Sequence, residues 1–388
     1  MRSGTYCSLW MVIVVGLCVS LARADESRGA GDGAGFRPMF NGKDLSGWRH
    51  VNTAPSTWTW KDDMLICSGK PIGELRTERM YQNFVLELEW RHMVPKGNAG
   101  IFVWADDITA RGQPFHRSVE VQVLENAYGN TRGYTTHGDI FPIHGATMKP
   151  INGRGGDRAF PTENRSRPSP EWNHYRIVCK DGDISLAVNG KVVTRGTECS
   201  PRKGYICIES EGGIVHYRNM RIKELPSTPV DARHVAIAER GYRCLYSGVD
   251  LSGWKSVGEW KPSDWMLKYG GKTEGKLTSV EAFGDLGFIV DVRWTEGAGK
   301  PALLLRGSDA GRIALYAHDE YGASFEKKNW NRLEGKLRGN KLWMTINGKA
   351  VLEGKELEGL PPRGSLTFIA DAPLDLANMY VREFEKAE

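Results

Sequence analysis

The sequence predicts an all-β protein built from two tandem antiparallel β-sandwich domains of the concanavalin A-like jelly-roll kind. Three observations favour this class: short segments of alternating polarity, no long segment with helical periodicity, and an internal repeat. The 388 residues include 46 glycines and 13 tryptophans, with 40% apolar and 26% charged residues. This composition excludes intrinsic disorder and provides enough apolar residues for two cores.

The N-terminus has the three parts of a secretory signal peptide. Arg2 precedes an apolar run from Leu9 to Leu21, and the small-x-small end Ala22-Arg23-Ala24 follows. The run is too short for a membrane anchor, so we predict a signal peptide over 1–24 and no integral membrane span. Residues 25–35 are glycine-rich and are expected to be a flexible lead-in. The expected location is periplasmic or secreted.

Charge and cysteine spacing exclude several classes of partner and site. The formal charge is +5 and falls to +3 once Arg2 and Arg23 are removed with the signal peptide. Without a basic block, a nucleic-acid partner has no electrostatic support. The sequence has seven cysteines, and the five that lie after the signal peptide lack CxxC spacing. This number and spacing indicate neither a zinc site nor a disulfide framework. Cys179 and Cys207 fall in expected strands, where a buried thiol behaves as a small hydrophobe. One disulfide bond among these cysteines is compatible with export to an oxidising compartment.

The internal repeat sets the domain organisation. Phe40–Trp48, with the sequence FNGKDLSGW, returns as YSGVDLSGW at Tyr246–Trp254. Further landmarks recur in the same order, so the two copies are expected to share a fold. We predict a first sandwich over 36–225, a linker over 226–242 and a second, degenerate sandwich over 243–388.

Within the first copy the expected strands alternate with a period of two residues. The segments concerned are Phe84–Trp90, Ser118–Leu124, His174–Cys179 and Ile184–Val188. Asp181-Gly182 and Asn189-Gly190 are strong two-residue hairpin signals, and they predict a meander of three strands.

The two copies differ most in one loop. The first copy holds roughly 36 additional residues, mostly within Asn126–Pro170, and a loop of this length in a compact domain is usually functional or disordered. Its aromatic and polar mixture favours an ordered loop over one sheet. The candidate polar residues in it are His137, Asp139, His144, Lys149 and Arg154.

The strand before this loop also differs between the copies. Its valines alternate with Glu120 and Gln122, which therefore lie on the opposite face. The second copy is expected to place Ala314 and Tyr316 at these two positions.

A second pair of carboxylates shows the same asymmetry. Ile206 and Ile208 are expected to face the core, which leaves Glu209 and Glu211 on the other face. The second copy has Thr367 and Ile369 in this region and no carboxylate pair. The first copy is thus expected to carry a polar site, and the second to be mainly supportive.

Several motifs together resemble the 3-keto-disaccharide hydrolase domain family. They are Phe40–Trp48, Gly97–Phe102, Val119–Leu124, Glu171–Asn173, Val188–Gly190 and Ser210–Gly213. The resemblance covers about 36–225 fully and 243–386 as a degenerate copy. It implies a concanavalin A-like jelly roll and exported bacterial proteins that cleave glycosides carrying a ketone at sugar carbon 3, by hydrolysis or elimination. Members of the family often have an arginine where Trp104 stands, and the second copy keeps one, Arg306.

Elimination from a 3-keto sugar requires a base, an acid for the leaving oxygen, and stabilisation of the enolate. The residue types favour Glu120 or Glu211 as the base and His144 as the acid. Gln122, Lys149 or a divalent cation would stabilise the enolate. Glu209, Trp104, His137, Asp139 and Arg154 are the other candidates for substrate contact. No metal ligands are assigned.

Two other readings remain open. An ordinary glycosidase would use two carboxylates about 5 Å or about 6.5–9.5 Å apart, which Glu120 and Glu211 satisfy if their strands are neighbours. A non-catalytic, lectin-like protein that binds glycans is equally compatible with a sandwich fold.

Overall fold

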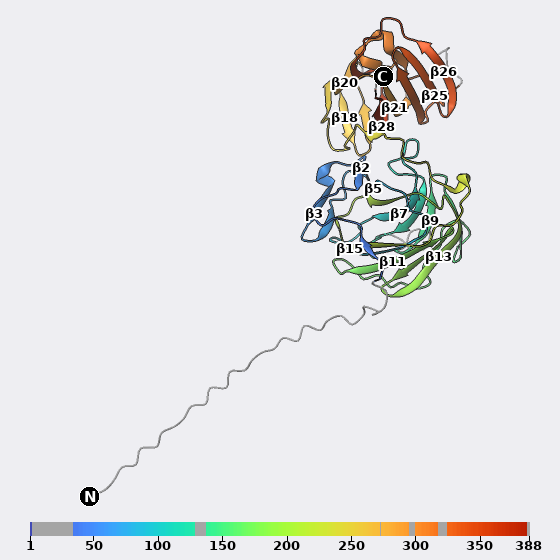
Figure 1. The fold of residues 1–388 in the computed structure, drawn as a ribbon. Coiled ribbons are helices and arrows are strands. Elements are labelled where there is room, and N and C mark those ends of the chain that lie inside the picture. Colours follow the sequence, from blue (N-terminus) through green and yellow to red (C-terminus); the bar gives the residue numbers. More distant parts are fainter. Residues whose placement is uncertain (2–33, 129–136, 272, 295–298, 317–323, 386–388) are drawn as a thin grey trace. The chain divides into compact units, whose positions relative to one another are not determined.

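Strands form almost all of the regular structure, and they assemble into four antiparallel sheets (Figure 1). The computed structural model describes Met1 and residues 34–128, 137–271, 273–294, 299–316 and 324–385. Apart from Met1, the predicted signal peptide lies outside these residues, as does nearly all of the lead-in. Within the described residues, no helix is both long and apolar enough to cross a membrane.

The first sandwich pairs a nine-stranded sheet with a six-stranded one. The nine-stranded sheet has the order β10-β13-β12-β11-β6-β15-β4-β3, with β1 beside β15. Its strands are β1 (Arg37–Pro38), β3 (Trp58–Lys61), β4 (Met64–Cys67), β6 (Phe84–His92), β10 (Thr147–Pro150), β11 (Asn173–Lys180), β12 (Asp183–Val188), β13 (Lys191–Ser200) and β15 (Val215–Glu224). The six-stranded sheet has the order β2-β5-β14-β7-β8-β9. Its strands are β2 (Trp48–Val51), β5 (Gly73–Thr77), β7 (Gly100–Ala105), β8 (Ser118–Gln122), β9 (Ile140–Ile143) and β14 (Tyr205–Ser210).

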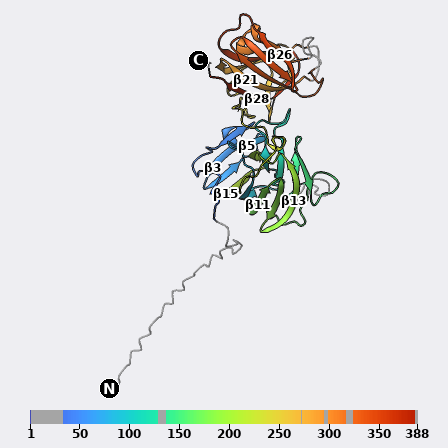
Figure 2. The same ribbon diagram turned by 45° about the vertical axis from the view of Figure 1, so that its right-hand side comes forward.

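The second sandwich repeats this plan with an eight-stranded and a five-stranded sheet (Figure 2). The eight-stranded sheet holds β16 (Arg243–Cys244), β18 (Trp260–Ser263), β19 (Met266–Tyr269), β21 (Leu286–Trp294), β24 (Asn331–Arg338), β25 (Lys341–Ile346), β26 (Lys349–Glu356) and β28 (Leu374–Glu383). The five-stranded sheet holds β17 (Trp254–Val257), β20 (Gly275–Phe283), β22 (Ala302–Leu304), β23 (Arg312–Ala314) and β27 (Gly364–Ala370). Short 3₁₀ turns are η1 (Pro55–Thr57), η2 (Ala232–His234), η3 (Leu305–Gly307) and η4 (Asp309–Gly311). The predicted fold class, two tandem antiparallel sandwiches, is confirmed.

The predicted meander is present as β11-β12-β13. Its turns have positive φ at both central residues: 54° and 92° at Asp181 and Gly182, and 47° and 88° at Asn189 and Gly190. Two-residue turns of this kind match the right-handed twist of the strands that they join, which is why Asp-Gly and Asn-Gly occur there.

Alternation along the six-stranded sheet separates a core face from an outer face. Leu75, Ile208, Ile101 and Val121 pair across β5, β14, β7 and β8, and all four are fully buried in the first core. Because successive side chains point to opposite faces, the residues between them form the outer face of this sheet.

The loop over residues 106–117, which we call the interface loop, is hydrogen-bonded to the second sandwich. The backbone N–H of Gly112 donates to Asp291 Oδ2 at 2.8 Å, and Asn378 Nδ2 donates to the carbonyl oxygens of Ala110 and Gln113. Gly112 has a φ of +69°, and an added Cβ would lie 2.2 Å from the ring of Trp330. The loop therefore requires glycine at this point, and it receives hydrogen bonds from the second sandwich in addition to those made within the first, such as Ala110 N–H to the Phe115 carbonyl oxygen at 2.8 Å.

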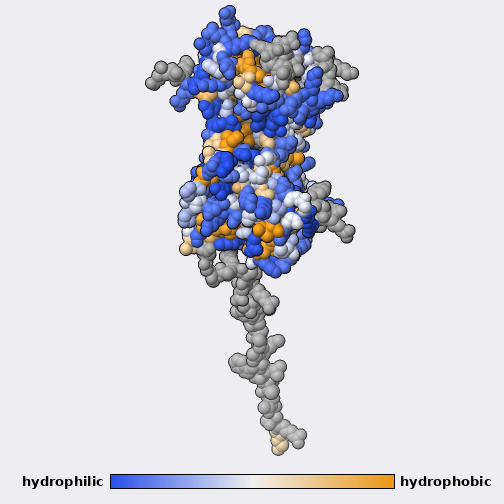
Figure 3. Space-filling model, turned by 90° about the vertical axis from the view of Figure 1, so that its right-hand side faces the viewer, coloured by the Kyte–Doolittle hydropathy of each residue, from blue (hydrophilic) through white to orange (hydrophobic). Residues whose placement is uncertain are grey.

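The surface carries no large apolar area on the side drawn in Figure 3. Hydrophilic residues cover most of this view, and the hydrophobic patches between them are small. This agrees with the mixture of charges in the sequence.

Candidate active site

Polar side chains gather on the outer face of the six-stranded sheet. Alternation and strand pairing place them on the same side, opposite the core face. We call this set the polar face; its members are Glu74, Asn98, Glu120, Gln122, Asp139, Glu209 and Glu211. It includes the four residues that the sequence predicts to lie opposite the core: Glu120, Gln122, Glu209 and Glu211.

Gly100 on β7 lies at the centre of the polar face. It pairs with Gln122 on β8, and the pairing of β7 with β14 brings Glu209 beside it. A Cβ added at Gly100 would lie 2.9 Å from Glu120 Oε1 and 3.0 Å from Glu209 Oε2. The two carboxyl groups therefore occupy the space that a side chain at Gly100 would fill.

Glu120 and Glu209 are both buried carboxyl groups with raised pKa values. Glu120 is 6% exposed and Glu209 is 1% exposed. Burial raises the pKa of Glu120 well above its ordinary value and Glu211 raises it further, while Arg158 acts in the opposite direction. Burial likewise raises the pKa of Glu209, followed by repulsion from Glu120 and Glu211. Neighbouring buried carboxylates resist ionising together.

Glu211 differs from these two because it is only half-buried. Burial raises its pKa, whereas hydrogen bonds with Glu209 and Asn98 lower it. The Asn98 amide donates to Glu211 Oε2, and Asn98 Oδ1 accepts from Gln122 Nε2 at 2.8 Å. This chain of amides fixes the orientation of the Glu211 carboxylate and favours its ionised form.

A cation borders the polar face at β9. Arg158 Nη1 donates to Asp139 Oδ2 at 3.0 Å, and its guanidinium lies 3.3 Å from the centre of the Phe141 ring. Phe141 pairs with Glu120 across β8 and β9. Asp139 is fully buried, and its carbonyl oxygen accepts the backbone N–H of Gln122 at 2.9 Å. The long loop thus contributes both an acid and its counter-ion.

Three other residues proposed from the long loop lie on the surface. His144 follows β9 in a turn with a φ of 54°, where surrounding protein lowers its pKa. Lys149 lies on β10, in the other sheet of the sandwich, and pairs with Glu198 at 3.3 Å. Arg154 is exposed, and its guanidinium stacks 4.0 Å from the centre of the Phe160 ring. Lys149 thus lies on an edge strand of the nine-stranded sheet and makes an ion pair with Glu198, so its expected role beside the carboxylates stays a prediction.

His137 is buried in the turn before β9. Its Nδ1 has no hydrogen-bond partner among the described residues, and burial lowers its pKa. Asn164 and Glu125 are the neighbours that act against this shift. His137 is therefore a neutral group at the edge of the sandwich.

Trp104 is part of the core and has no exposed surface, so its expected contact with substrate is wrong. Its Nε1 donates to the carbonyl oxygen of Gln82 at 2.8 Å, and its ring packs edge-on against Phe84. The cause is a backbone irregularity: Trp104 has a φ of 57°, so it joins Val103 in the core and breaks the alternation. Arg306 has a φ of 53° at the corresponding place in the second sandwich.

Strand pairing also corrects the expected match between the copies. Val121 pairs with Ile101 as Ile313 pairs with Leu303, so Arg312 and Ala314 replace Glu120 and Gln122. The expectation that Ala314 and Tyr316 take these positions is wrong by two residues. Ile369 replaces Glu209, as expected, and Lys276 replaces Glu74. The second sandwich thus lacks the carboxylate cluster, although its matching face has cations and not only apolar groups.

Three residue types that can bind a metal lie together at one side of the polar face: Glu74, His116 and Cys207. The sequence signal for Glu74 is present, since it alternates with the core residue Leu75. The position of His116 could not be predicted from the sequence pattern, because this residue lies near the end of the interface loop and outside any strand. Cys207 is buried as predicted, but it faces outward with Phe102 and Tyr205 instead of entering the main core. All five described cysteines are free thiols.

Comparisons with known proteins find a family model, a curated relative and several solved structures that are similar to part of this chain. Residues 35–223 match the model of a 3-keto-alpha-glucoside-1,2-lyase-like domain. A 3-keto-disaccharide hydrolase of Bacteroides thetaiotaomicron is 25% identical, in a match covering 50% of this chain and 80% of that protein. A solved structure of a candidate glycosyl hydrolase from Parabacteroides distasonis is 22% identical, with a TM-score of 0.38, and covers 50% of this chain and 94% of that one. A Bacillus licheniformis β-glucanase is 13% identical, with a TM-score of 0.34, over 49% of this chain and 97% of that one. The match of residues 35–223 to this family model coincides with the first sandwich.

Proposed function

We propose that the first sandwich cleaves glycosides that carry a ketone at carbon 3 of the sugar. The family and its Bacteroides relative support this substrate class. The observation that carries the proposal is a cluster of three neighbouring carboxyl groups with raised pKa values, in which Glu211 alone is not fully buried and accepts a hydrogen bond from an amide, that of Asn98. Paired groups with separated proton affinities are what acid–base catalysis requires.

Glu211 is assigned as the base. The ketone acidifies the hydrogen on carbon 2, and Glu211 takes this proton while the bond between carbon 1 and the leaving oxygen breaks. The raised pKa of Glu211 suits it for removing a carbon-bound proton near neutral pH. Asn98 and Gln122 act as positioning residues, because they orient the carboxylate. Water then adds to the unsaturated sugar and gives the free 3-keto sugar.

Glu120 is assigned as the acid in place of His144. Burial raises its pKa well above the ordinary value and it keeps 6% of its surface, which suits it to give a proton to the leaving oxygen. His144 suits this role less well, because its lowered pKa leaves the ring neutral near pH 7. Arg158 is assigned the role expected for Lys149, stabilisation of the enolate. Its guanidinium is a cation that borders the polar face.

Export to the periplasm or beyond and a carbohydrate partner are part of this proposal. The signal-peptide pattern of residues 1–24 supports export. The family supports the carbohydrate.

The test is turnover of a panel of 3-keto-glucosides, with the unoxidised glucosides alongside. We expect release of the 3-keto sugar from the oxidised substrates only, and a lower rate when carbon 2 carries deuterium. Glu211→Gln should reduce kcat by about 10²–10⁴, the usual contribution of a general base. Glu198→Gln, on the exposed surface of β13, is the matched control and should keep full activity.

Three results would overturn the proposal. Cleavage of the unoxidised glucosides with no deuterium effect would instead indicate an ordinary glycosidase. Binding of intact sugar without turnover would indicate a lectin-like protein. Full activity of Glu211→Gln in a protein that turns over the 3-keto substrate would remove Glu211 from the mechanism.

A further inference from the structure

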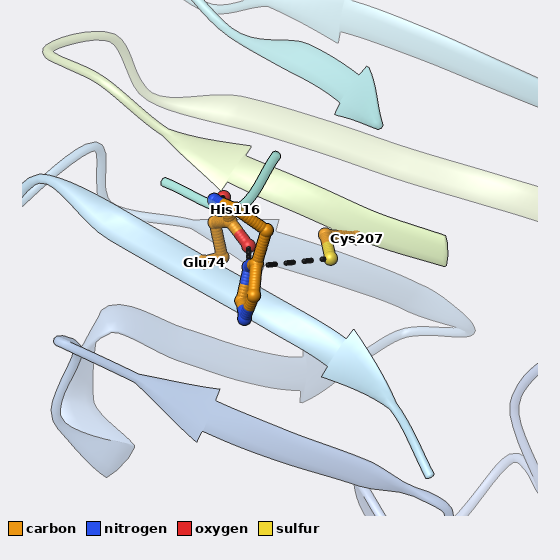
Figure 4. A group of neighbouring side chains, drawn as sticks. All are labelled: Glu74, His116 and Cys207. Atoms are coloured by element: carbon orange, nitrogen blue, oxygen red, sulfur yellow. Dashed lines mark hydrogen bonds and ion pairs between the residues drawn. The ribbon is translucent and has the colours of Figure 1, made fainter. Parts of the chain in front are cut away.

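Glu74, His116 and Cys207 bring three different donor atoms to one point beside the polar face (Figure 4). One ligand atom of each side chain lies within 4.8 Å of the other two. His116 Nδ1 contacts both Glu74 Oε2 and Cys207 Sγ. Glu74 comes from β5, Cys207 from β14 and His116 from the end of the interface loop. None of the three side chains has exposed surface. We call this group the Glu–His–Cys cluster.

The donor set is that of a borderline or soft divalent metal. Thiolate and imidazole select Zn²⁺ or Co²⁺ over Mg²⁺ and Ca²⁺, which prefer oxygen ligands alone. Three protein ligands with a fourth position left for water or another group is the arrangement of catalytic zinc sites. His116 and Cys207 supply the two ligands that distinguish this site from an ordinary acidic cluster.

The spacing is close to what a shared metal requires. Cys207 Sγ lies 3.8 Å from His116 Nδ1. Bond lengths of about 2.3 Å to sulfur and about 2.0 Å to nitrogen at a tetrahedral angle separate the two ligands by roughly 3.5 Å. Glu74 Oε2 contacts His116 Nδ1 directly, so this oxygen has to move outward by roughly 1 Å to admit an ion. Glu74 Oε1 accepts the backbone N–H of His116 at 3.0 Å and can keep the carboxylate in place during this movement.

The internal duplication provides an independent observation. Glu74 and Cys207 correspond by strand pairing to Lys276 and Thr367 in the second sandwich. A lysine and a threonine do not form a zinc site, so both strand ligands are replaced together in the copy that also lacks the carboxylate cluster. The second sandwich therefore lacks both strand ligands of the Glu–His–Cys cluster.

We propose that Glu74, His116 and Cys207 form a binding site for one zinc-class divalent ion per chain. Binding displaces the thiol proton of Cys207, which leaves as a solvent proton, and the thiolate, the imidazole and the carboxylate complete three of the four positions. The proposal goes beyond the proposed function and does not depend on it, because it concerns binding and not turnover. A metal-binding protein without lyase activity would leave it intact.

The experiment is a cobalt titration of the whole protein after treatment with a chelator under reducing conditions. Because the cluster is buried, a parallel sample is unfolded and refolded with cobalt present. We expect one Co²⁺ per chain, a sulfur-to-cobalt charge-transfer band in the near ultraviolet, and release of protons on binding. Zn²⁺ should displace the cobalt and raise the denaturation midpoint.

Cys207→Ser is the principal variant and Cys244→Ser, a half-buried cysteine in the second sandwich, is its control. The first should lose the charge-transfer band and the stabilisation by zinc, and the second should keep both. His116→Gln provides a second test, and the denaturation midpoint of the metal-free variants shows whether they fold.

Two results would overturn the site. One is a wild-type protein that binds less than one cobalt per chain by both routes, which would leave a hydrogen-bonded pair only. The other is a folded Cys207→Ser variant that retains the band.

Discussion

Glu120, Glu209 and Glu211 carry the same functional group, yet their surroundings give them different proton affinities. Burial raises the pKa of all three, but only Glu211 has an amide donor that favours its charge. For Glu120 the folded state holds a proton more strongly than the unfolded chain does. Stability therefore decreases as the pH rises from the ordinary carboxyl pKa towards the raised value.

Replacement of Glu120 by glutamine should remove this pH dependence. Near pH 4.5 both proteins should be similar in stability, and above it the wild type should fall relative to Glu120→Gln. Each unit of pKa shift corresponds to about 1.4 kcal/mol. Urea denaturation from pH 4.5 to 8 in the presence of chelator measures the difference, with Glu198→Gln as the exposed control. Parallel stability curves for wild type and Glu120→Gln would contradict the prediction.

At the scale of elements, β7 determines how closely the carboxyl groups approach. Gly100 leaves the space in which Glu120 and Glu209 meet, between β8 and β14. A side chain at this position would separate them, because neither the sheet backbone nor Phe102, 3.1 Å from the added Cβ, can easily yield.

Gly100→Ala should therefore lower both activity and stability. We expect a loss of about 1–3 kcal/mol, typical of overpacking in a buried site, and a decrease of at least tenfold in kcat on a 3-keto-glucoside. Gly156→Ala, whose added Cβ would meet nothing within 4 Å, is the control and should change neither. Wild-type kcat in Gly100→Ala would show that the approach of the two carboxyl groups is unimportant.

The sequence predicts the elements and faces well because alternation has a period of two. It locates Glu120, Gln122, Glu209 and Glu211 on the polar face correctly, and it locates the hairpin turns. It misplaces Trp104, because one left-handed residue changes which face the chain presents. It also misaligns Arg312 by two residues, a shift that leaves the faces unchanged and that a period-two pattern cannot detect. His116 was beyond prediction because a contact between loop and strand depends on tertiary folding.

At the scale of the whole molecule, the second sandwich holds a part of the first. Asp291 Oδ2 accepts hydrogen bonds from Gly112 N at 2.8 Å and from Asn378 Nδ2 at 2.7 Å, and both Asp291 oxygens pair with Arg332. Arg332 also donates to the carbonyl oxygen of Thr109 at 2.8 Å. This network fixes the interface loop, which contains His116.

Asp291→Asn should destabilise the whole protein, because it removes the fully buried carboxylate that pairs with the half-buried Arg332. Breaking such a pair costs about 3–5 kcal/mol, and the interface loop should become sensitive to proteolysis. Asp309→Asn, which alters an exposed pair with Arg312, should have little effect on either measurement. Equal denaturation midpoints for the two variants would contradict the importance of this network.

The hydrogen bonds between Asn378 and the interface loop give the second sandwich a structural role. A second sandwich without the carboxylate cluster can still be required to hold a loop of the first sandwich in place. We therefore expect a protein truncated after residue 224 to be inactive, although it keeps Glu120, Glu211 and the other proposed reactive residues.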